Sequence, residues 1–407
     1  MKHMNERTTP VSPDHYMADP SFQLLLQLSR LQLSQEHVQA VEELIPRIQD
    51  WEGFTRQASE RFVLPIVHSH LSKRWKHQVP EPYIDVMKRY SFGALKHNLN
   101  MTAEFKHIIR DVLLPLQVPH LCFKGPSLAF QYYPEPAQRL CRDVDILVSQ
   151  KDLPKILQHA LNSGYQPYDP KALTPDDESV AFVAKHQKVV TLLSPRNVAV
   201  EFHTKIDNTG SVFNASRMLE KRQPIAVNHI DTWVMPINEL FVYLCWHHTK
   251  HYWSRLHWLV DITAMQSHKD FNLNEVLACA NRYSLESTVS SCLEMIEYFS
   301  APTLRTIEEL TPNTRELVRT SILAMHGDVE FEHSLSRKKP TPDFSFGWQT
   351  TNAQIWQWRL WGWKRMFRPT YDSYAAWPLT RNWQWVYRCI RPFHEAYNRL
   401  GHKKIVN

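Results

Sequence analysis

The stretch from residue 119 to residue 148 constrains the fold more than any other part of this 407-residue chain. The apolar residues 120–123 predict a short buried strand. This strand ends at Lys124-Gly125, and Pro126 follows where the first residue of a helix would stand, a position that suits its fixed φ. A strand, a glycine and a helix start in this order predict a local α/β unit.

The start of the predicted helix is a candidate phosphate site. Its backbone N–H groups are free and carry the positive end of the helix dipole, and Ser127 lies beside them. Lys124, Arg139 and Arg142 are the nearest cations, and the planar guanidinium of arginine is the better fork for phosphate oxygens. We therefore predict phosphate contacts from these residues and Gly125, with pairing to an acidic residue as the alternative for Lys124.

Two carboxylates follow on a second predicted strand. Side chains alternate along a strand, so Asp143 and Asp145 point to one face, about 7 Å apart. Carboxylates this close repel each other, and a divalent cation between them is the simplest relief. A lone Asp-x-Asp pair is more often a solvated edge or loop. Its place after a strand, a glycine and a helix start favours a site for a divalent cation.

These motifs together resemble a known family. Lys124-Gly125, the Tyr-Tyr-Pro run at 132–134 and the Arg-x-x-Arg-Asp-Val-Asp-Ile-Leu-Val run at 139–148 resemble the signature of the uncharacterised nucleotidyltransferase family in the DNA-polymerase-β-like superfamily. That superfamily has a Gly-Gly or Gly-Ser turn, an Asp-x-Asp/Glu strand and a third carboxylate on a later strand. Here a proline separates glycine from serine and the spacing to Asp143 is long, as in the uncharacterised branch.

The resemblance implies a third carboxylate on the predicted strand at residues 197–203. Glu201 and His203 point to one face of this strand and match the family's acidic-x-His motif. An exposed strand face is the alternative. The implied catalytic and metal-binding trio is Asp143, Asp145 and Glu201, with His203 bordering the cleft.

A histidine-rich block lies on two further predicted helices. His247 and His251 stand four residues apart, as do His257 and Asp261, so each pair shares a helix face. A zinc site with these four ligands is one interpretation, but no glutamate stands between the histidines as in H-E-x-x-H. The spacing of His247, His251, Arg255 and Asp261 resembles the family's second block, which implies that they border a nucleotide or acceptor cleft.

The pattern along the chain predicts an α+β fold, with a small mixed-sheet core between N-terminal and C-terminal helical regions. Scarce glycine (9) and abundant tryptophan (14) favour helices. The expected organisation is a disordered N-terminus (1–18), a helical region (19–113), the core (114–235), a helical region (236–332), a linker (333–347) and a basic, Trp-rich helical tail (348–407).

Within the core, residues 182–193 are predicted as one strand and residues 224–235 as a hairpin. The chain has no run of eighteen apolar residues, its N-terminus lacks an apolar signal region, and its six cysteines are scattered. We therefore expect reduced core thiols and a cytoplasmic protein.

The C-terminal tail combines charge with aromatic side chains. Residues 336–407 hold thirteen Lys/Arg and three Asp/Glu, and eight of the fourteen tryptophans lie within them. The favoured prediction is packing on the helical body, with Trp383, Trp385, Tyr387 and Phe393 buried. Peripheral contact with an anionic membrane and contact with a polyanion are the alternatives. No base-reading motif is present, so there is no strong nucleic-acid signal.

The function that the resemblance implies is transfer of a nucleoside monophosphate from an NTP to an acceptor hydroxyl, with release of pyrophosphate and dependence on Mg²⁺ or Mn²⁺. A non-catalytic nucleotide-binding module is one alternative. A metal-dependent hydrolase that uses the His247/His251 cluster is another. The sequence leaves the acceptor and the preferred base open.

Overall fold

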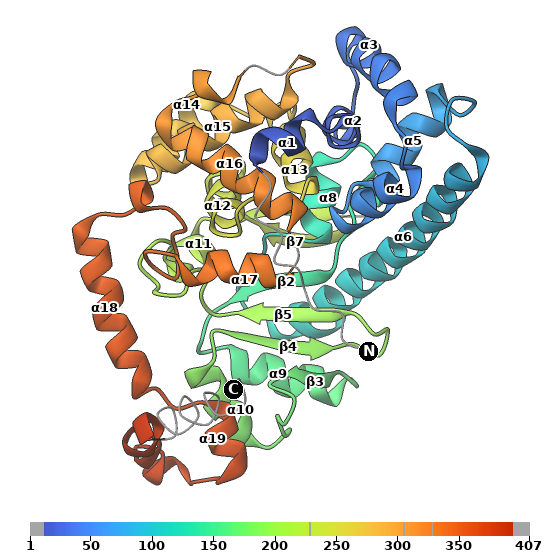
Figure 1. The fold of residues 1–407 in the computed structure, drawn as a ribbon. Coiled ribbons are helices and arrows are strands. Elements are labelled where there is room, and N and C mark those ends of the chain that lie inside the picture. The colour runs from blue at the N-terminus through green and yellow to red at the C-terminus, as the bar shows by residue number, and fades with distance from the viewer. Residues whose placement is uncertain (1–11, 228, 304–305, 328, 394–407) are drawn as a thin grey trace, which may run out of the picture.

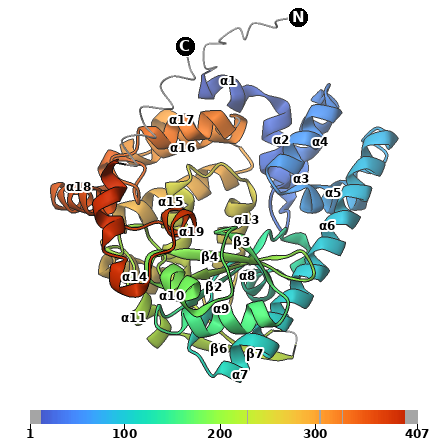
Figure 2. The same ribbon diagram turned by 90° about the horizontal axis from the view of Figure 1, so that it is seen from below.

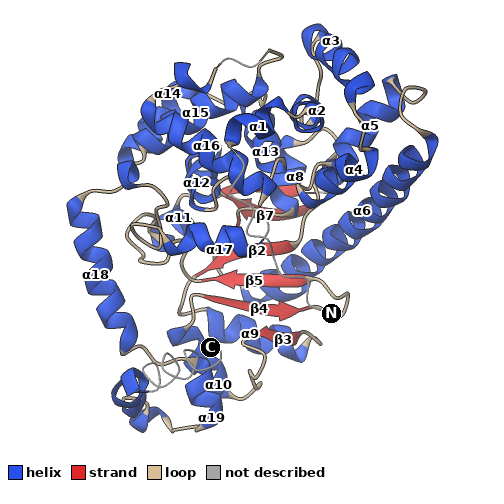
Figure 3. Cartoon of the chain, in the orientation of Figure 1, coloured by secondary structure: helices blue, strands red, loops and turns tan. Residues whose placement is uncertain are grey.

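A seven-stranded mixed sheet crosses the molecule between layers of helices (Figures 1 and 3). The computed structural model describes residues 12–393 except 228, 304–305 and 328. The strand order in the described residues is β3-β4-β5-β2-β1-β7-β6, which confirms the α+β fold with helical flanks. The strands are β1 (His120–Cys122), β2 (Asp143–Val148), β3 (Gln166–Asp169), β4 (Val189–Leu193), β5 (Ala199–His203), β6 (Gln223–Val227) and β7 (Ile230–Val234).

Strand β2 holds the centre of the sheet. It pairs antiparallel with β1 and parallel with β5, and the register places Asp145 opposite Glu201. Five of its six residues are buried, as expected for a strand covered on both faces. The parallel pairing therefore brings the two predicted acidic strands side by side.

Short helices connect the strands of this core. They are α8 (Pro126–Tyr132), α9 (Leu153–Asn162), α10 (Asp177–His186) and α11 (Ala215–Glu220). The prediction of one strand over residues 182–193 is wrong in its first half, because α10 covers that part. The Asp176 carboxylate accepts a hydrogen bond from the backbone N–H of Ser179 and so caps this helix. The hairpin predicted at 224–235 is present as β6 and β7.

Helices precede the core from residue 13 onwards. They are α1 (Pro13–Ala18), α2 (Pro20–Leu28), α3 (Gln35–Leu44), α4 (Trp51–Glu60), α5 (Leu64–Arg74) and α6 (Glu81–His107), and a π-helical turn then leads into α7 (Leu114–Leu116). The expected disorder over residues 1–18 is not found at 13–18, where Pro13 opens α1 and the Ser12 hydroxyl caps it. Residues 1–11 lie outside the described part of the chain.

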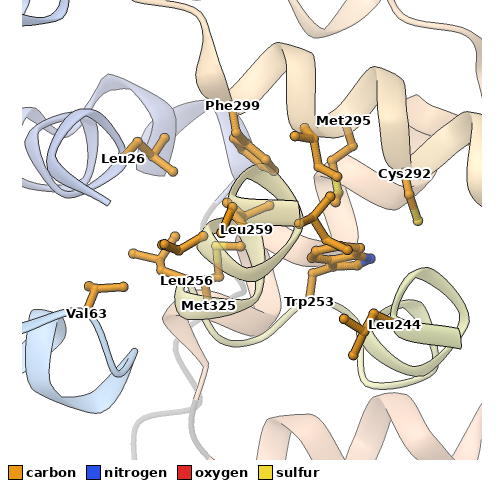
Figure 4. Close-up of a cluster of buried hydrophobic side chains, with 14 of the residues drawn as sticks. Leu26, Val63, Leu244, Trp253, Leu256, Leu259, Cys292, Met295, Phe299 and Met325 are labelled. Atoms are coloured by element: carbon orange, nitrogen blue, oxygen red, sulfur yellow. The ribbon is translucent and has the colours of Figure 1, made fainter. Parts of the chain in front are cut away.

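The helices after the core pack with the N-terminal ones in one hydrophobic core. They are α12 (Ile237–Lys250), α13 (His257–Gln266), α14 (Leu273–Arg282), α15 (Glu286–Ser300), α16 (Pro312–His326) and α17 (Val329–Arg337). Figure 4 shows Leu26 of α2 and Val63, which directly precedes α5, in the same cluster as Leu259 and Phe299. The two helical regions that the sequence presents as separate flanks therefore form one helical body.

The segment predicted as a linker, residues 333–347, is packed. Helix α17 takes up its first part, and Phe344 and Phe346 belong to the core of the helical body. The Asp343 carboxylate accepts hydrogen bonds from the backbone N–H groups of Asn208 (2.8 Å) and Thr209 (2.9 Å). This segment therefore ties the helical body to the loop after β5.

The tail differs from its prediction. Helix α18 (Asn352–Met366) stands apart from the body and α19 (Tyr371–Ala376) returns towards the sheet (Figures 1 and 2). Trp383, Trp385 and Phe393 are exposed, and Tyr387 is buried, but against the α/β core rather than the helical body. Among the described helices, none is long and apolar enough to cross a membrane.

Candidate active site

A cavity of about 310 Å³ lies where the ends of β1 and β2 meet helices α12 and α13. The sheet side supplies Lys124, Gly125, Asp143 and Asp145. The helical side supplies, among others, Phe62, Arg255, Glu332 and four histidines: His247, His248, His251 and His257. The cavity therefore joins the Asp-x-Asp strand to the histidine-rich block, which are about a hundred residues apart in the chain.

The two carboxylates of β2 experience opposite electrostatic environments. Burial, together with the neighbouring charge of Asp145, raises the pKa of Asp143 to about 7. Asp145 is only 1% exposed, and burial alone would raise its pKa too. The charges of Lys124 and His203 outweigh burial and hold the pKa of Asp145 below its ordinary value. Asp145 is therefore the fixed negative charge of the site.

Lys124 and His203 converge on the same oxygen of Asp145. The Lys124 Nζ atom and the His203 Nε2 atom each lie 3.0 Å from Asp145 Oδ1. His203 Nε2 also lies 3.2 Å from Glu201 Oε2. Burial lowers the pKa of His203, but its hydrogen bonds to the two carboxylates raise it above its ordinary value. Lys124 therefore pairs with an acidic residue, which was the alternative to its predicted phosphate contact.

One group of side chains has the donor atoms for a cation. Asp145, Glu201 and His203 each offer one ligand atom, all within 4.8 Å of one another, and no other such group of three occurs in the described residues. Asp145 Oδ2 is buried and has no hydrogen-bond partner there. Two carboxylates and this orphaned oxygen fit a hard divalent cation. Asp143, which was predicted as a ligand, lies outside this group, two residues before Asp145 on β2.

The glycine turn is built as predicted, but its serine points elsewhere. Gly125 has φ +58, and a Cβ atom there would lie 2.5 Å from the backbone oxygen of Asp143. Only glycine fits this close approach. The Ser127 hydroxyl is buried and donates to the carbonyl of Lys124 (2.8 Å), so it holds the turn together. Ser127 does not line the cavity, and its predicted role in phosphate binding has no support from this placement.

Arg139 is committed to a structural contact. Its guanidinium donates to both oxygens of Asp261, at 2.7 and 2.9 Å, and the Tyr133 hydroxyl donates to the same carboxylate at 2.7 Å. Arg139 is thereby neutralised and Asp261 faces it rather than an open cleft. Arg142 differs, since no carboxylate pairs with it in the described part of the chain. Its guanidinium lies 5.8 Å from the Phe62 ring centre, at the cavity wall.

The histidines line the cavity without forming a metal site. The His247 and His251 rings lie 4.8 Å apart, and within the described residues no third metal ligand joins them. Arg255, predicted at the cleft, does line it and donates to Glu332 at 3.0 Å. The interpretation of His247, His251, His257 and Asp261 as zinc ligands is therefore wrong for the arrangement seen here.

His248 is a cavity residue that the spacing argument passed over. It is 2% exposed and stacks on Trp258 at 4.6 Å, yet neither ring nitrogen has a hydrogen-bond partner among the residues described. Burial holds the pKa of His248 well below its ordinary value. Its position inside the His-His-Thr-Lys-His run was the only signal. No sequence signal pointed to Phe62, which has φ +62, or to Glu332, because only tertiary packing brings these residues to the cavity.

Comparison with known proteins agrees with this geometry. A family model described as "Uncharacterised nucleotidyltransferase" matches residues 48–300, more than half of the 407-residue chain. The match includes the carboxylates, the glycine turn and the histidine block, and it excludes Glu332 and the tail. No curated protein matches the sequence. The chain belongs to the uncharacterised nucleotidyltransferase family.

Proposed function

We propose that this protein transfers a nucleoside monophosphate from an NTP to an acceptor hydroxyl and releases pyrophosphate. The observation that carries the proposal is the placement of Asp143 and Asp145 beside the Gly125 turn, at one end of a cavity that Arg142 also lines. In this reaction the acceptor oxygen forms a bond to the α-phosphorus, the bond from the α-phosphorus to its bridging oxygen breaks, and pyrophosphate leaves.

The proposed metal ligands are Asp145 and Glu201, with Asp143 next to them on β2. A bound Mg²⁺ or Mn²⁺ would lower the pKa of the acceptor hydroxyl and neutralise charge on the α-phosphate. His203 bridges Asp145 and Glu201 and so orients both carboxylates. The Glu201 side chain is 29% exposed and so is accessible to an acceptor hydroxyl, whose proton it accepts in this proposal.

The remaining residues bind and orient the nucleotide in this proposal. Lys124 and Arg142 are the cations closest to the carboxylates. Lys124 is paired with Asp145, whereas Arg142 has no carboxylate partner in the described residues and so is available to a phosphate. Gly125 lets the backbone approach the phosphates closely. The stacked pair of Trp258 and the neutral His248 offers one ring face and one donor–acceptor group to the uncharged part of a substrate.

The test is binding of ATP, GTP, CTP and UTP, each with and without Mg²⁺ or Mn²⁺, measured by thermal shift and calorimetry. We expect metal-dependent binding of at least one NTP, and loss of that binding in Asp143→Asn and Asp145→Asn. Asp231→Asn, an exposed strand aspartate on β7, is the matched control. Equal NTP binding with and without metal, or equal binding by the Asp145 variant, would contradict the proposal.

The hydrolase alternative has no supporting geometry in the described residues, because the histidines lack a third ligand. Catalytic turnover distinguishes the proposed transferase from the alternative of a non-catalytic nucleotide-binding module. Pyrophosphate release from a bound NTP, in the presence of added acceptor hydroxyl compounds, excludes it.

A further inference from the structure

The tail, defined here as residues 351–393, buries its tyrosines and exposes its tryptophans. Tyr371, Tyr374 and Tyr387 are at most 5% exposed and surround Phe182 of α10, with ring centres 4.5 to 6.2 Å from it. The Tyr371 hydroxyl lies 2.5 Å from the Ser179 hydroxyl. Three tyrosines therefore dock the tail on the α/β core, and this anchor needs none of the tryptophans.

The exposed tryptophans gather on helix α18 and the segment after it. Trp356, Trp363, Trp377, Trp383 and Trp385 are 57% to 67% exposed. Helix α18 has no buried residue at all. Trp356, Leu360 and Trp363 follow an i, i+4, i+7 spacing, so they share one face of a helix that stands apart from the body (Figures 1 and 2).

Cations accompany these rings. Residues 352–393 contain seven Lys/Arg and a single acidic residue, Asp372. The Arg359 guanidinium lies 5.0 Å from the Trp356 ring centre, beside the exposed face. In the described chain neither Arg359 nor Lys364 forms an ion pair. Exposed aromatic surface of this size, edged by uncompensated positive charge, marks a binding surface for something both apolar and anionic.

A cavity of about 530 Å³ runs between α18 and the core. The rings of Trp361, Trp363 and Phe367 line it, together with four Lys/Arg side chains and no carboxylate. Arg368 also donates to the carbonyl of His186, which fixes one of these cations at the cavity wall. The cavity therefore combines rings with positive charge as the exposed face of α18 does, and Trp363 belongs to both.

We propose that the tail is a peripheral membrane-binding element whose partner is an anionic phospholipid bilayer. Exposed tryptophans take the headgroup level of a bilayer, and Lys/Arg beside them attract anionic lipids. A single-stranded nucleic acid fits less well, because it is bound in a groove with rings spaced for successive bases, whereas the exposed rings here are divided between α18 and the segment after it. A second copy fits less well too, because two patches of net charge +6 (seven cations, one acid) would repel each other.

The test is co-sedimentation of the full chain with phosphatidylcholine vesicles, with or without phosphatidylglycerol. We expect much stronger binding to the phosphatidylglycerol vesicles than to pure phosphatidylcholine. High salt should weaken this binding towards the phosphatidylcholine level without abolishing it, because burial of tryptophan is not screened. The double substitution Arg359→Gln/Lys364→Gln should lower the partition coefficient about 30-fold, about five-fold for each cation. Trp356→Gln/Trp363→Gln should lower it about ten-fold per tryptophan, since each loses roughly 60 Å² of apolar burial.

The matched control is Phe92→Gln/Leu99→Gln, which removes two equally exposed apolar side chains from α6 and should leave vesicle binding unchanged. Melting temperatures close to that of the parent show that all variants fold. Absence of binding to anionic vesicles overturns the proposal, and so does equal loss in the control variant. Tighter binding to single-stranded DNA or heparin than to vesicles, or a dimer that the tryptophan substitutions dissociate, overturns it in favour of those partners.

Discussion

The cavity and the tail use the same side chains, arginine, lysine and large aromatic rings, in opposite ways. In the cavity two cations, Lys124 and Arg139, are compensated: Lys124 lies 3.0 Å from Asp145, and Arg139 lies 2.7 Å from Asp261. In the tail Arg359 and Lys364 are exposed and have no carboxylate partner in the described residues. The aromatic rings follow the same division, packed against histidines in one region and facing solvent in the other.

This difference indicates what kind of partner each region accepts. A buried charge must be paired to be tolerated, so the free groups of the cavity are the informative ones. The buried ones are Asp145 Oδ2, both ring nitrogens of His248 and His257 Nδ1, and the exposed Arg142 joins them as a cation without a carboxylate partner in the described residues. This sparse set suits a small ligand with a few defined contacts. The tail has several similar exposed cations and rings, and its exposed face forms no pocket around a ligand. Such a face suits an extended binding partner rather than a small molecule.

The largest expected effect on stability tests the compensation in the cavity. Asp261→Asn removes the negative charge that holds Arg139 and one of the two oxygens that accept its hydrogen bonds, and so leaves a buried guanidinium uncompensated. We expect a loss of about 3–5 kcal/mol in the free energy of unfolding. Glu308→Gln, which breaks the exposed pair with Arg319, should cost less than about 1 kcal/mol. Urea unfolding measures both, and equal losses would refute the distinction.

A pair of glycine substitutions should have opposite signs in the two regions. Gly125→Ala places a Cβ atom 2.5 Å from the Asp143 carbonyl oxygen at a positive φ. We expect a loss of about 1–3 kcal/mol in the free energy of unfolding, with weaker NTP binding. Gly362→Ala in α18 meets nothing within 4 Å and should stabilise the helix by about 1 kcal/mol. Thermal unfolding distinguishes them, and a tolerated alanine at Gly125 would show that the turn is adaptable.

The sequence predicted those parts of the site that depend on local order. The Asp-x-Asp strand, the glycine turn and the later Glu-x-His strand could be found because strand alternation and turn chemistry act over a few residues. The register that pairs Asp145 with Glu201 then follows from parallel pairing of β2 and β5. The family resemblance supplied the order of these pieces, and the family model confirms it.

Two things could not be predicted from the sequence: contacts between residues distant in the chain, and the direction of a side chain within a turn. Arg139 was predicted to bind phosphate and does line the cavity, but the ion pair that it forms there could not be foreseen, because Asp261 is 122 residues away and no local pattern joins them. Ser127 was predicted to contact phosphate, but its hydroxyl donates to the Lys124 carbonyl, because the turn after Gly125 directs the hydroxyl inward. In the tail, ring size and apolar character favoured burial of the tryptophans. The smaller tyrosines occupy the buried positions instead. The Tyr371 hydroxyl contacts Ser179 on the core, and the Tyr387 hydroxyl donates to the Trp377 carbonyl within the tail.

A smaller effect concerns pH. His248 is buried with its pKa well below the ordinary value of about 6.5, so the unfolded chain binds a proton below that pH and the folded chain does not. The free energy of unfolding should therefore fall as pH drops below about 6.5, by about 1.4 kcal/mol per pH unit from this residue. His248→Phe keeps a ring against Trp258 and should flatten the slope by that amount. Urea unfolding at several pH values measures it, and an unchanged slope would show that His248 titrates normally.

The smallest expected effect on the free energy of unfolding distinguishes the buried tyrosines of the tail from its exposed tryptophans. Tyr371→Phe removes a hydroxyl that contacts Ser179 and accepts from the backbone of Thr174, so the free energy of unfolding should fall by about 1 kcal/mol. Trp356→Gln/Trp363→Gln removes far more apolar surface, but that surface is exposed in the folded chain, so the change should stay within about 0.5 kcal/mol. Burial, and not side-chain size, decides the outcome. A larger loss for the tryptophan variant than for Tyr371→Phe would place those rings inside a folded interface, and the contrast between the compensated cavity and the open tail would then fail.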